Sequence, residues 1–99
     1  MEDITVQEFR QRKEAGEKIN LLDVREAWEF EEDNLEGLLI PLGDLPTRFT
    51  EIKNWQDEEI VVHCRTGGRS GKAKEFLKTK GFTKVRNLLG GIAAYRESE

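Results

Sequence analysis

The chain has 99 residues, 36% of them hydrophobic and 36% charged, which suits a single domain spanning residues 1–99. Its net charge of −4 at pH 7 disfavours nucleic acids and anionic membranes as partners, because proteins that bind these usually carry a basic patch. No apolar run approaches the roughly 18–20 residues of a membrane span, and the acidic start Met1-Glu2-Asp3 leads us to expect no secretory signal and a cytoplasmic protein.

The first half of the chain alternates short apolar runs with helical patterns. These predict, in order, a helix over 6–15, a strand over 19–24, a helix over 26–32, a strand over 37–40, and a turn with a helix over 44–53. Thr5 with Glu8 three residues later is a capping-box pattern at the start of the first helix. Pro41 ends the second strand, and Pro46 suits the first turn of the helix that follows it.

The second half continues the alternation, with a strand over 59–63, a helix over 70–80, a strand over 85–88 and a helix that opens at 91–95. The run from Ile60 to His63 is the strongest strand signal, so we expect it in the centre of the sheet. Strands that alternate with helices indicate a parallel sheet with helices on both faces. Ligands bind outside the carboxyl ends of such strands, which here are Asp23-Val24-Arg25, the segment after Ile40 and the residues after His63.

The segment after the central strand carries the chemistry. It consists of Cys64, Arg65, Thr66, Gly67, Gly68, Arg69 and Ser70. A strand, a glycine-bearing loop and a helix N-terminus form an anion cradle, because the loop amides point inward and the helix dipole adds positive charge. Gly67 and Gly68 let the backbone wrap closely, and we expect Arg69 at the mouth and Arg65 at the rim. The amides would stabilise the thiolate of Cys64, so we interpret Cys64 as a nucleophile rather than a small core residue.

The remaining candidates near this edge have structural interpretations. Cys64 is the only cysteine and His63 the only histidine, which leaves no internal disulfide or multi-cysteine metal site, and we expect no metal or cofactor. Strand alternation points His63 to the opposite face, where we expect it to be packed. We expect Asp23 to support the site through the loop or an arginine, the alternative being a helix N-cap. Arg25 has Glu29 four residues on as a candidate partner.

These segments together resemble the rhodanese family of sulfurtransferases. Residues 64–70 resemble its active-site loop, residues 21–26 its Asp-Val-Arg strand end, and residues 89–92 its closing Gly-Gly helix start. Residues 33–37 lack the Gly-His-Ile-Pro stretch that the family commonly has. In this respect the chain is similar to rhodanese domains fused to adenylyltransferases that activate sulfur carriers. The resemblance implies a rhodanese-like α/β domain with a parallel sheet of about five strands.

The resemblance also implies an activity. It is a sulfurtransferase that moves sulfane sulfur from thiosulfate or another persulfide donor to a thiophilic acceptor through a persulfide on Cys64. Residues 65–70 would bind the anionic donor, and Asp23 and Arg25 would support the site. The implied partners are a small sulfur-containing anion such as thiosulfate, and a thiol protein, a cysteine desulfurase or a sulfur-carrier protein.

Two alternatives stay open. Loops of cysteine-dependent phosphatases and arsenate reductases resemble Cys, five residues, Arg, whereas four residues separate Cys64 from Arg69 here. The shorter ring favours a single sulfur atom over a tetrahedral oxyanion. The other alternative is a noncatalytic rhodanese-like interaction module. Such modules commonly lack the cysteine, which this chain keeps together with both arginines.

Overall fold

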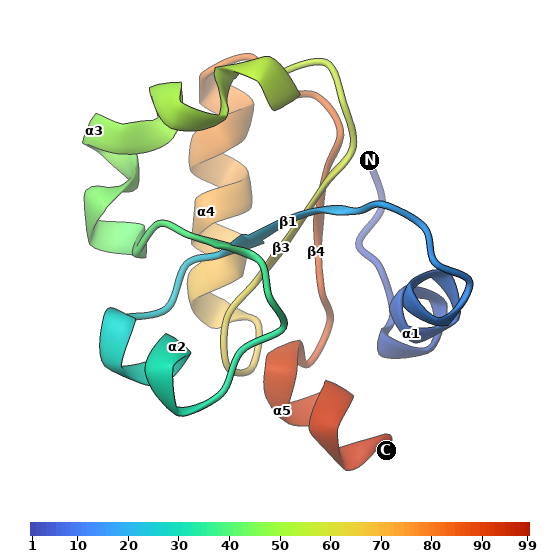
Figure 1. The fold of residues 1–99 in the computed structure, drawn as a ribbon. Helices are drawn as coiled ribbons and strands as arrows, with labels where there is room; N and C mark the ends of the chain where they lie inside the picture. The colour runs from blue at the N-terminus through green and yellow to red at the C-terminus, as the bar shows by residue number, and fades with distance from the viewer.

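A four-stranded parallel sheet runs through the computed structural model, which describes residues 1–99 (Figure 1). The strands are β1 (Asn20–Asp23), β2 (Leu38–Leu39), β3 (Ile60–His63) and β4 (Val85–Asn87), in the spatial order β2-β1-β3-β4. β3 pairs with β1 on one side and β4 on the other, as its sequence predicts. In place of a fifth strand, Ile4 forms one parallel bridge to Leu88, because Thr5 caps a helix immediately afterwards and ends the extended segment.

Helices cover both faces of this sheet. They are α1 (Val6–Glu14), α2 (Ala27–Glu32), α3 (Leu45–Arg48), α4 (Gly68–Thr79) and α5 (Gly91–Glu97), with two 3₁₀ helices, η1 (Leu42–Asp44) and η2 (Phe49–Trp55). Buried side chains of α3 and α4 belong to one core cluster, and those of α1 and α5 belong to a second. Figure 1 shows α4 running alongside the strands, with α1 and α5 together on the far side from α3.

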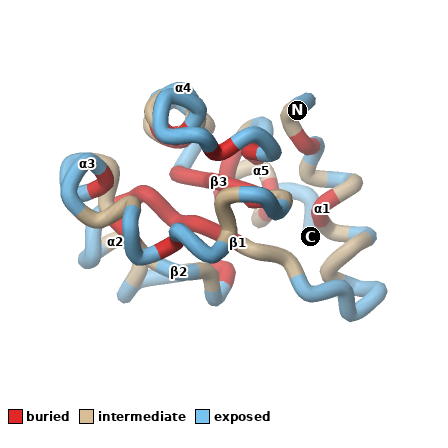
Figure 2. The backbone as a smooth tube through the Cα atoms, turned by 90° about the horizontal axis from the view of Figure 1, so that it is seen from above, coloured by how far each residue is buried: buried red, intermediate tan, exposed pale blue.

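The alternation of side chains along β3 separates the two cores. Ile60 and Val62 belong to the cluster under α4, and so does Cys64 immediately after the strand. Val61 points to the opposite face, toward α1 and α5. Figure 2 shows this central strand as a continuous buried segment. Since both faces are covered, a side chain at the carboxyl end of β3 meets the first turn of a helix rather than open solvent.

The structure differs from the predicted elements in one long segment. A turn and one helix are expected over 44–53, but the helix is interrupted, because the backbone leaves helical geometry at Arg48 (φ −116°, ψ 0°) and again at Ile52 (φ −112°, ψ 21°). The segment instead forms α3 followed by the 3₁₀ helix η2. Leu45 of α3 and Ile52 of η2 are both buried. Pro46 lies in the first turn of α3, where a missing N–H costs nothing.

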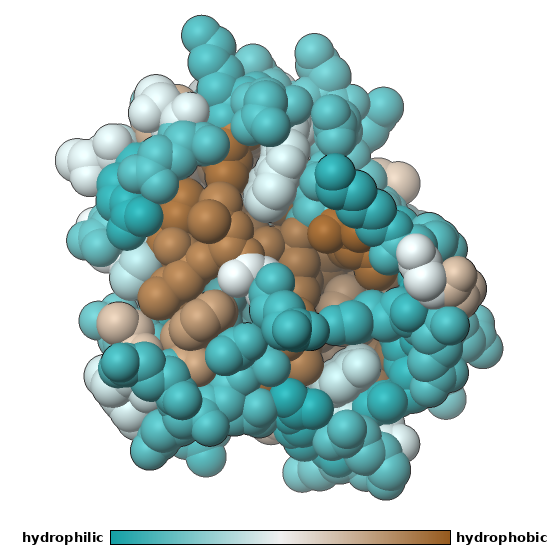
Figure 3. All heavy atoms as spheres, in the orientation of Figure 1, coloured by the Kyte–Doolittle hydropathy of each residue, from teal (hydrophilic) through white to brown (hydrophobic).

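The outer surface is dominated by hydrophilic side chains. Figure 3 shows them as a rim around apolar side chains that gather in the middle of the face seen in Figure 1. The large apolar residues that are exposed are Met1, Trp28, Leu38 and Leu89. None of the helices is both long and apolar enough to cross a membrane.

Candidate functional site

The loop after β3 is shorter than the sequence predicts, because Gly67 adopts a left-handed conformation. Its φ of 114° and ψ of −11° make it the N-cap of α4, which begins at Gly68 rather than at Ser70. Gly68, Arg69 and Ser70 therefore form the first turn of the helix, and only three residues connect it to Cys64. A residue with a side chain adopts this φ at a cost, which explains a glycine here.

The sulfur of Cys64 lies inside this turn and faces its hydrogen-bond donors. The backbone N–H of Gly67 donates to Sγ over 3.1 Å and that of Ser70 over 3.4 Å. The Ser70 hydroxyl oxygen lies 3.3 Å from the same sulfur. Burial raises the pKa of the Cys64 thiol. The hydrogen bonds from Ser70, Gly67 and the Thr66 amide lower it by a larger amount, so the pKa lies below its ordinary value.

Asn87, at the carboxyl end of β4, forms hydrogen bonds to both Gly67 and Ser70. Its Nδ2 donates to the carbonyl of Gly67 over 3.1 Å, and its Oδ1 lies 2.6 Å from Ser70 Oγ. Its backbone N–H donates to Asp3 Oδ1 over 3.0 Å. Asn87 is not among the site residues predicted from the sequence. The rule that ligands gather at the carboxyl ends of strands also applies to β4, the neighbour of β3, and could have identified it.

Arg69, which we expect at the mouth of the loop, already has an acidic partner there. Its guanidinium makes a two-pronged ion pair with Glu29 of α2, with N–O distances of 2.6 and 2.8 Å. Glu29 also accepts the backbone N–H of Glu26 over 3.0 Å, which turns its carboxylate toward the loop. The bonds from Arg69 hold the pKa of Glu29 at about 2, against an ordinary 4.5. The expected pair between Arg25 and Glu29 is therefore wrong.

Asp23 and Arg25 pair with each other on the other face of the sheet. Arg25 Nε donates to Asp23 over 3.0 Å and its Nη2 over 2.8 Å, with both residues buried. The N-cap of α2 is Glu26, so the N-cap alternative for Asp23 is wrong. His63 Nε2 lies 3.6 Å from Asp23 Oδ2, and neither ring nitrogen has a hydrogen-bond partner. Burial lowers the pKa of His63, which favours the neutral ring. None of these side chains donates a hydrogen bond to the sulfur, although Arg25 lines the cavity beside the loop.

The first turn of α5 closes the backbone around Cys64. The N–H of Ile92 donates to the Cys64 carbonyl and that of Ala93 to the Arg65 carbonyl, each over 3.0 Å. Gly91 lies so close that a Cβ there would be 2.4 Å from the Arg65 oxygen. Glycine is therefore required for this contact. The sulfur of Cys64 faces the start of α4, while its carbonyl faces the start of α5.

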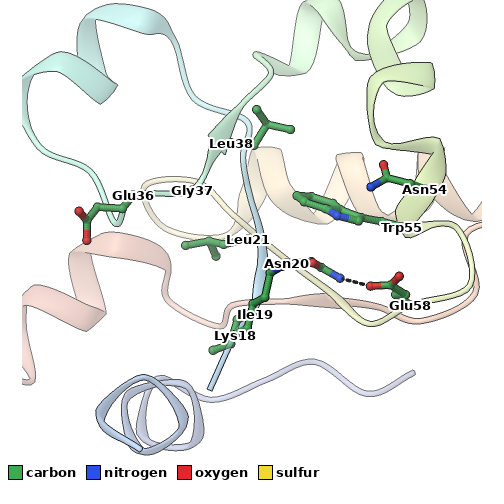
Figure 4. Close-up of a pocket in the computed structure, with 10 residues that line it drawn as sticks. All are labelled: Lys18, Ile19, Asn20, Leu21, Glu36, Gly37, Leu38, Asn54, Trp55 and Glu58. Carbon is green, nitrogen blue, oxygen red and sulfur yellow. Dashed lines mark hydrogen bonds between the residues drawn. The ribbon is translucent and has the colours of Figure 1, made fainter. Parts of the chain in front are cut away.

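Two cavities lie on different sides of the site. One of about 370 Å³ adjoins the loop and is lined by Arg65, Trp28, Glu29, Ile92 and Arg96, among others. A second, of about 470 Å³, lies at the amino ends of the strands beside Asn20, Leu38 and Trp55, and no loop residue lines it (Figure 4). Only the first is placed to admit a molecule that reacts beside the loop. No group of three or more His, Cys, Asp or Glu side chains is placed to bind a metal ion.

Known proteins resemble the chain over nearly all of its length. A sulfurtransferase of Allochromatium vinosum is 33% identical over 94 residues, which are 94% of this chain and 86% of that protein. YrkF of Bacillus subtilis is 36% identical over 91 residues, but the chain covers only 48% of it. The adenylyltransferase and sulfurtransferase MOCS3-1 of Zea mays is 34% identical over 98 residues, and the chain covers 21% of it. The predicted similarity to domains fused to adenylyltransferases is confirmed.

Solved structures agree with these sequence matches. The crystal structure of a rhodanese-related protein from Thermoplasma volcanium superposes with a TM-score of 0.84 at 26% identity, covering 99% of this chain and 93% of that one. The parallel α/β fold predicted from the sequence is thereby confirmed, with four strands. Residues 5–98 match the family described as the rhodanese-like domain. The chain belongs to the rhodanese-like domain family.

Proposed function

We propose that this chain is a sulfurtransferase that carries sulfane sulfur as a persulfide on Cys64. The observation that carries the proposal is the convergence of the Gly67 and Ser70 amides on Sγ, at 3.1 and 3.4 Å. Such donors stabilise a sulfur anion, and the thiolate is the form of cysteine that attacks. The name of the Allochromatium vinosum relative, of which the chain covers 86%, supports the same chemistry.

The first step loads the sulfur. The Cys64 thiol loses its proton to solvent, and the thiolate attacks the outer sulfur of thiosulfate or of another persulfide. A bond forms between Sγ and that sulfur, the sulfur–sulfur bond of the donor breaks, and sulfite or a thiolate leaves with the bonding electron pair. Covalent catalysis of this kind divides one difficult transfer into two displacements.

The second step delivers the sulfur. The thiolate of an acceptor attacks the terminal sulfur of the persulfide, and Cys64 leaves as a thiolate with the bonding pair. The Gly67 and Ser70 amides that stabilise the attacking thiolate stabilise the leaving one equally, so the same donors serve both steps. A leaving thiol departs faster when its pKa is lower.

Arg65 is the residue that we assign to recruiting an anionic donor. It is exposed, it forms no ion pair, and it lines the cavity beside the loop, whereas Arg69 is neutralised by Glu29. The exposed Trp28 lines the same cavity and would contact a larger donor or acceptor there. We propose thiosulfate as the small donor. A cysteine desulfurase persulfide, a thiol protein or a sulfur-carrier protein would use the same opening.

Intact mass spectrometry tests the proposal. After incubation with thiosulfate and removal of excess reagent, we expect the protein to gain the mass of one sulfur atom and the Cys64→Ser variant to gain none. Addition of a small thiol should remove the added mass. Equal gain in both proteins, or no gain in either, would contradict the persulfide.

An aryl phosphate assay separates the phosphatase alternative. We expect negligible hydrolysis, because four residues separate Cys64 from Arg69, one fewer than in the phosphatase loops, and a shorter ring favours a single sulfur atom over a tetrahedral oxyanion. Hydrolysis that is lost in Cys64→Ser would favour the phosphatase, and inactivity in both assays would favour a noncatalytic module.

A further inference from the structure

The hydroxyl of Ser70 has two acceptors within reach and one proton to donate. Its oxygen lies 2.6 Å from Asn87 Oδ1 and 3.3 Å from Cys64 Sγ. A separation of 2.6 Å between two oxygens requires a hydrogen between them, because two lone pairs at that distance would repel each other. A hydroxyl carries only one hydrogen, so it cannot also donate to the sulfur.

The alternative, in which Asn87 donates to Ser70, requires the amide to be turned over. The Nδ2 of Asn87 lies 3.1 Å from the carbonyl oxygen of Gly67, which is an acceptor only. Turning the amide would place Oδ1 against that carbonyl and leave two acceptors facing each other. Gly67 therefore fixes the amide orientation, and Asn87 presents Oδ1 to Ser70.

We propose that Asn87 is a positioning residue that holds the hydroxyl proton of Ser70 away from Cys64. In the resting protein the thiol of Cys64 then donates its own hydrogen to Ser70 Oγ. When Cys64 loses its proton, Ser70 must either keep its bond to Asn87 and present a lone pair to the thiolate, or break that bond to donate to the sulfur. Either response costs free energy, so Asn87 makes the thiolate less stable than a freely donating Ser70 hydroxyl would make it.

This arrangement would balance the two steps of sulfur transfer. A thiol of very low pKa leaves readily but attacks slowly, because nucleophilicity falls with pKa. By withholding the third donor, Asn87 keeps the attacking thiolate reactive during loading. The inference rests on the proposed role of Cys64 as the nucleophile, but the Cys64 ionisation that it concerns can be measured without any sulfur transfer.

Charged groups on every neighbouring element must stay constant in the test. The loop and α4 contribute Arg65, Arg69 and Lys74, and the N-terminal segment contributes Asp3. Glu29 lies on α2 and Glu26 is the N-cap of that helix. The far face of the sheet holds Asp23, Arg25 and His63. None of them is changed by substitution of Ser70 or Asn87 by an uncharged residue. The Gly67 carbonyl also keeps a partner in such variants, because the N–H of Gly71 donates to it over 3.0 Å.

The test is a double-mutant cycle on Cys64 ionisation, with the wild type, Asn87→Leu, Ser70→Ala and the double variant. The rate of alkylation by iodoacetamide against pH gives the midpoint of thiolate formation, and the plateau at high pH gives the reactivity of the thiolate. In Asn87→Leu the Ser70 hydroxyl is free to donate to the thiolate. We therefore expect the midpoint to fall by about one pH unit, which is a tenfold change in the thiolate-to-thiol ratio. The plateau should fall about threefold.

The Ser70→Ala background separates the effect of the hydroxyl proton from any change in loop structure that Asn87→Leu causes. Without the hydroxyl, adding Asn87→Leu should leave the midpoint within about 0.3 of Ser70→Ala alone, since the two changes act on one hydrogen bond. A midpoint that rises in Asn87→Leu, or an equal fall in both backgrounds, would overturn the proposal. If the cycle behaves as expected but thiosulfate adds no sulfur to the wild type, the proposed function fails while this inference stands.

Discussion

Replacing Glu29 with glutamine removes one charge from the ion pair that ties the helical turn after Cys64 to α2. The variant keeps the size of the side chain and one oxygen that can accept from Arg69. It loses the second charge-assisted bond and the attraction between the charges. If Glu29 holds Arg69 as the structure shows, the free energy of unfolding should fall, and it should fall only at pH values where the carboxylate of the wild type is ionised.

The pKa of Glu29 gives the size of the effect. A fall of the Glu29 pKa from 4.5 to about 2 corresponds to about 3 kcal/mol, because a change of one pKa unit is worth about 1.4 kcal/mol. The Arg69 side chain is 36% exposed, so water screens part of this energy. We therefore expect Glu29→Gln to lower the free energy of unfolding by about 1–2 kcal/mol at pH 7, and the melting temperature by roughly 5–15 °C.

Urea unfolding of the wild type and of Glu29→Gln between pH 7 and pH 2 measures this difference. The folded pKa is lowered, so the stabilisation is complete above about pH 4.5 and disappears as the pH falls toward 2. Glu32→Gln is the matched control, because it makes the same charge change on α2 at a carboxylate that has no ion-pair partner. A difference that stays constant with pH, or an equal loss in Glu32→Gln, would refute this reasoning.

Three further predictions concern the loop and its neighbours. Gly67→Ala should lower the free energy of unfolding in urea by about 1–3 kcal/mol, because the φ of 114° strains any residue with a side chain. A Cβ at Gly68 would have no neighbour within 4 Å, so Gly68→Ala should change the same free energy by less than about 0.5 kcal/mol. Gly91→Ala should lower the melting temperature more than Gly67→Ala, since its Cβ would lie 2.4 Å from the Arg65 oxygen; a smaller loss would contradict the close packing. The alkylation midpoint of wild-type Cys64 should lie below about 8.5, and a higher midpoint would mean that the loop does not activate the thiol.

The sequence predicts those parts of the fold that depend on local pattern. Alternation along residues 60–64 correctly separates Val61 from Val62, because a strand has a period of two whatever surrounds it. The predicted start of this helix at Ser70 was wrong, because a glycine such as Gly68 can equally remain in a loop or begin a helix. Only the left-handed φ of Gly67, which the sequence does not specify, decides where the helix begins.

The site was predictable only in part, for a different reason. Cys64 and its amide donors lie within seven residues, so the loop carries its own signal. The partners of that loop come from distant segments: Glu29 is 40 residues from Arg69, and Asn87 is 17 residues from Ser70. Spacing within the sequence said nothing about which of several acidic residues on α2 would face Arg69. The prediction that Arg25 pairs with Glu29 was wrong because Asp23, only two residues before Arg25 in the sequence, binds its guanidinium instead.

The closure of the Cys64 carbonyl by α5 has a consequence for the order of events during synthesis. A ribosome releases the chain from its N-terminus, and α5 comes after all the other helices and strands. Until Gly91, Ile92 and Ala93 have emerged, the carbonyls of Cys64 and Arg65 lack their partners, and the loop cannot settle into its final shape. We therefore expect the backbone around Cys64 to reach its final hydrogen-bonded geometry only after α5 has formed.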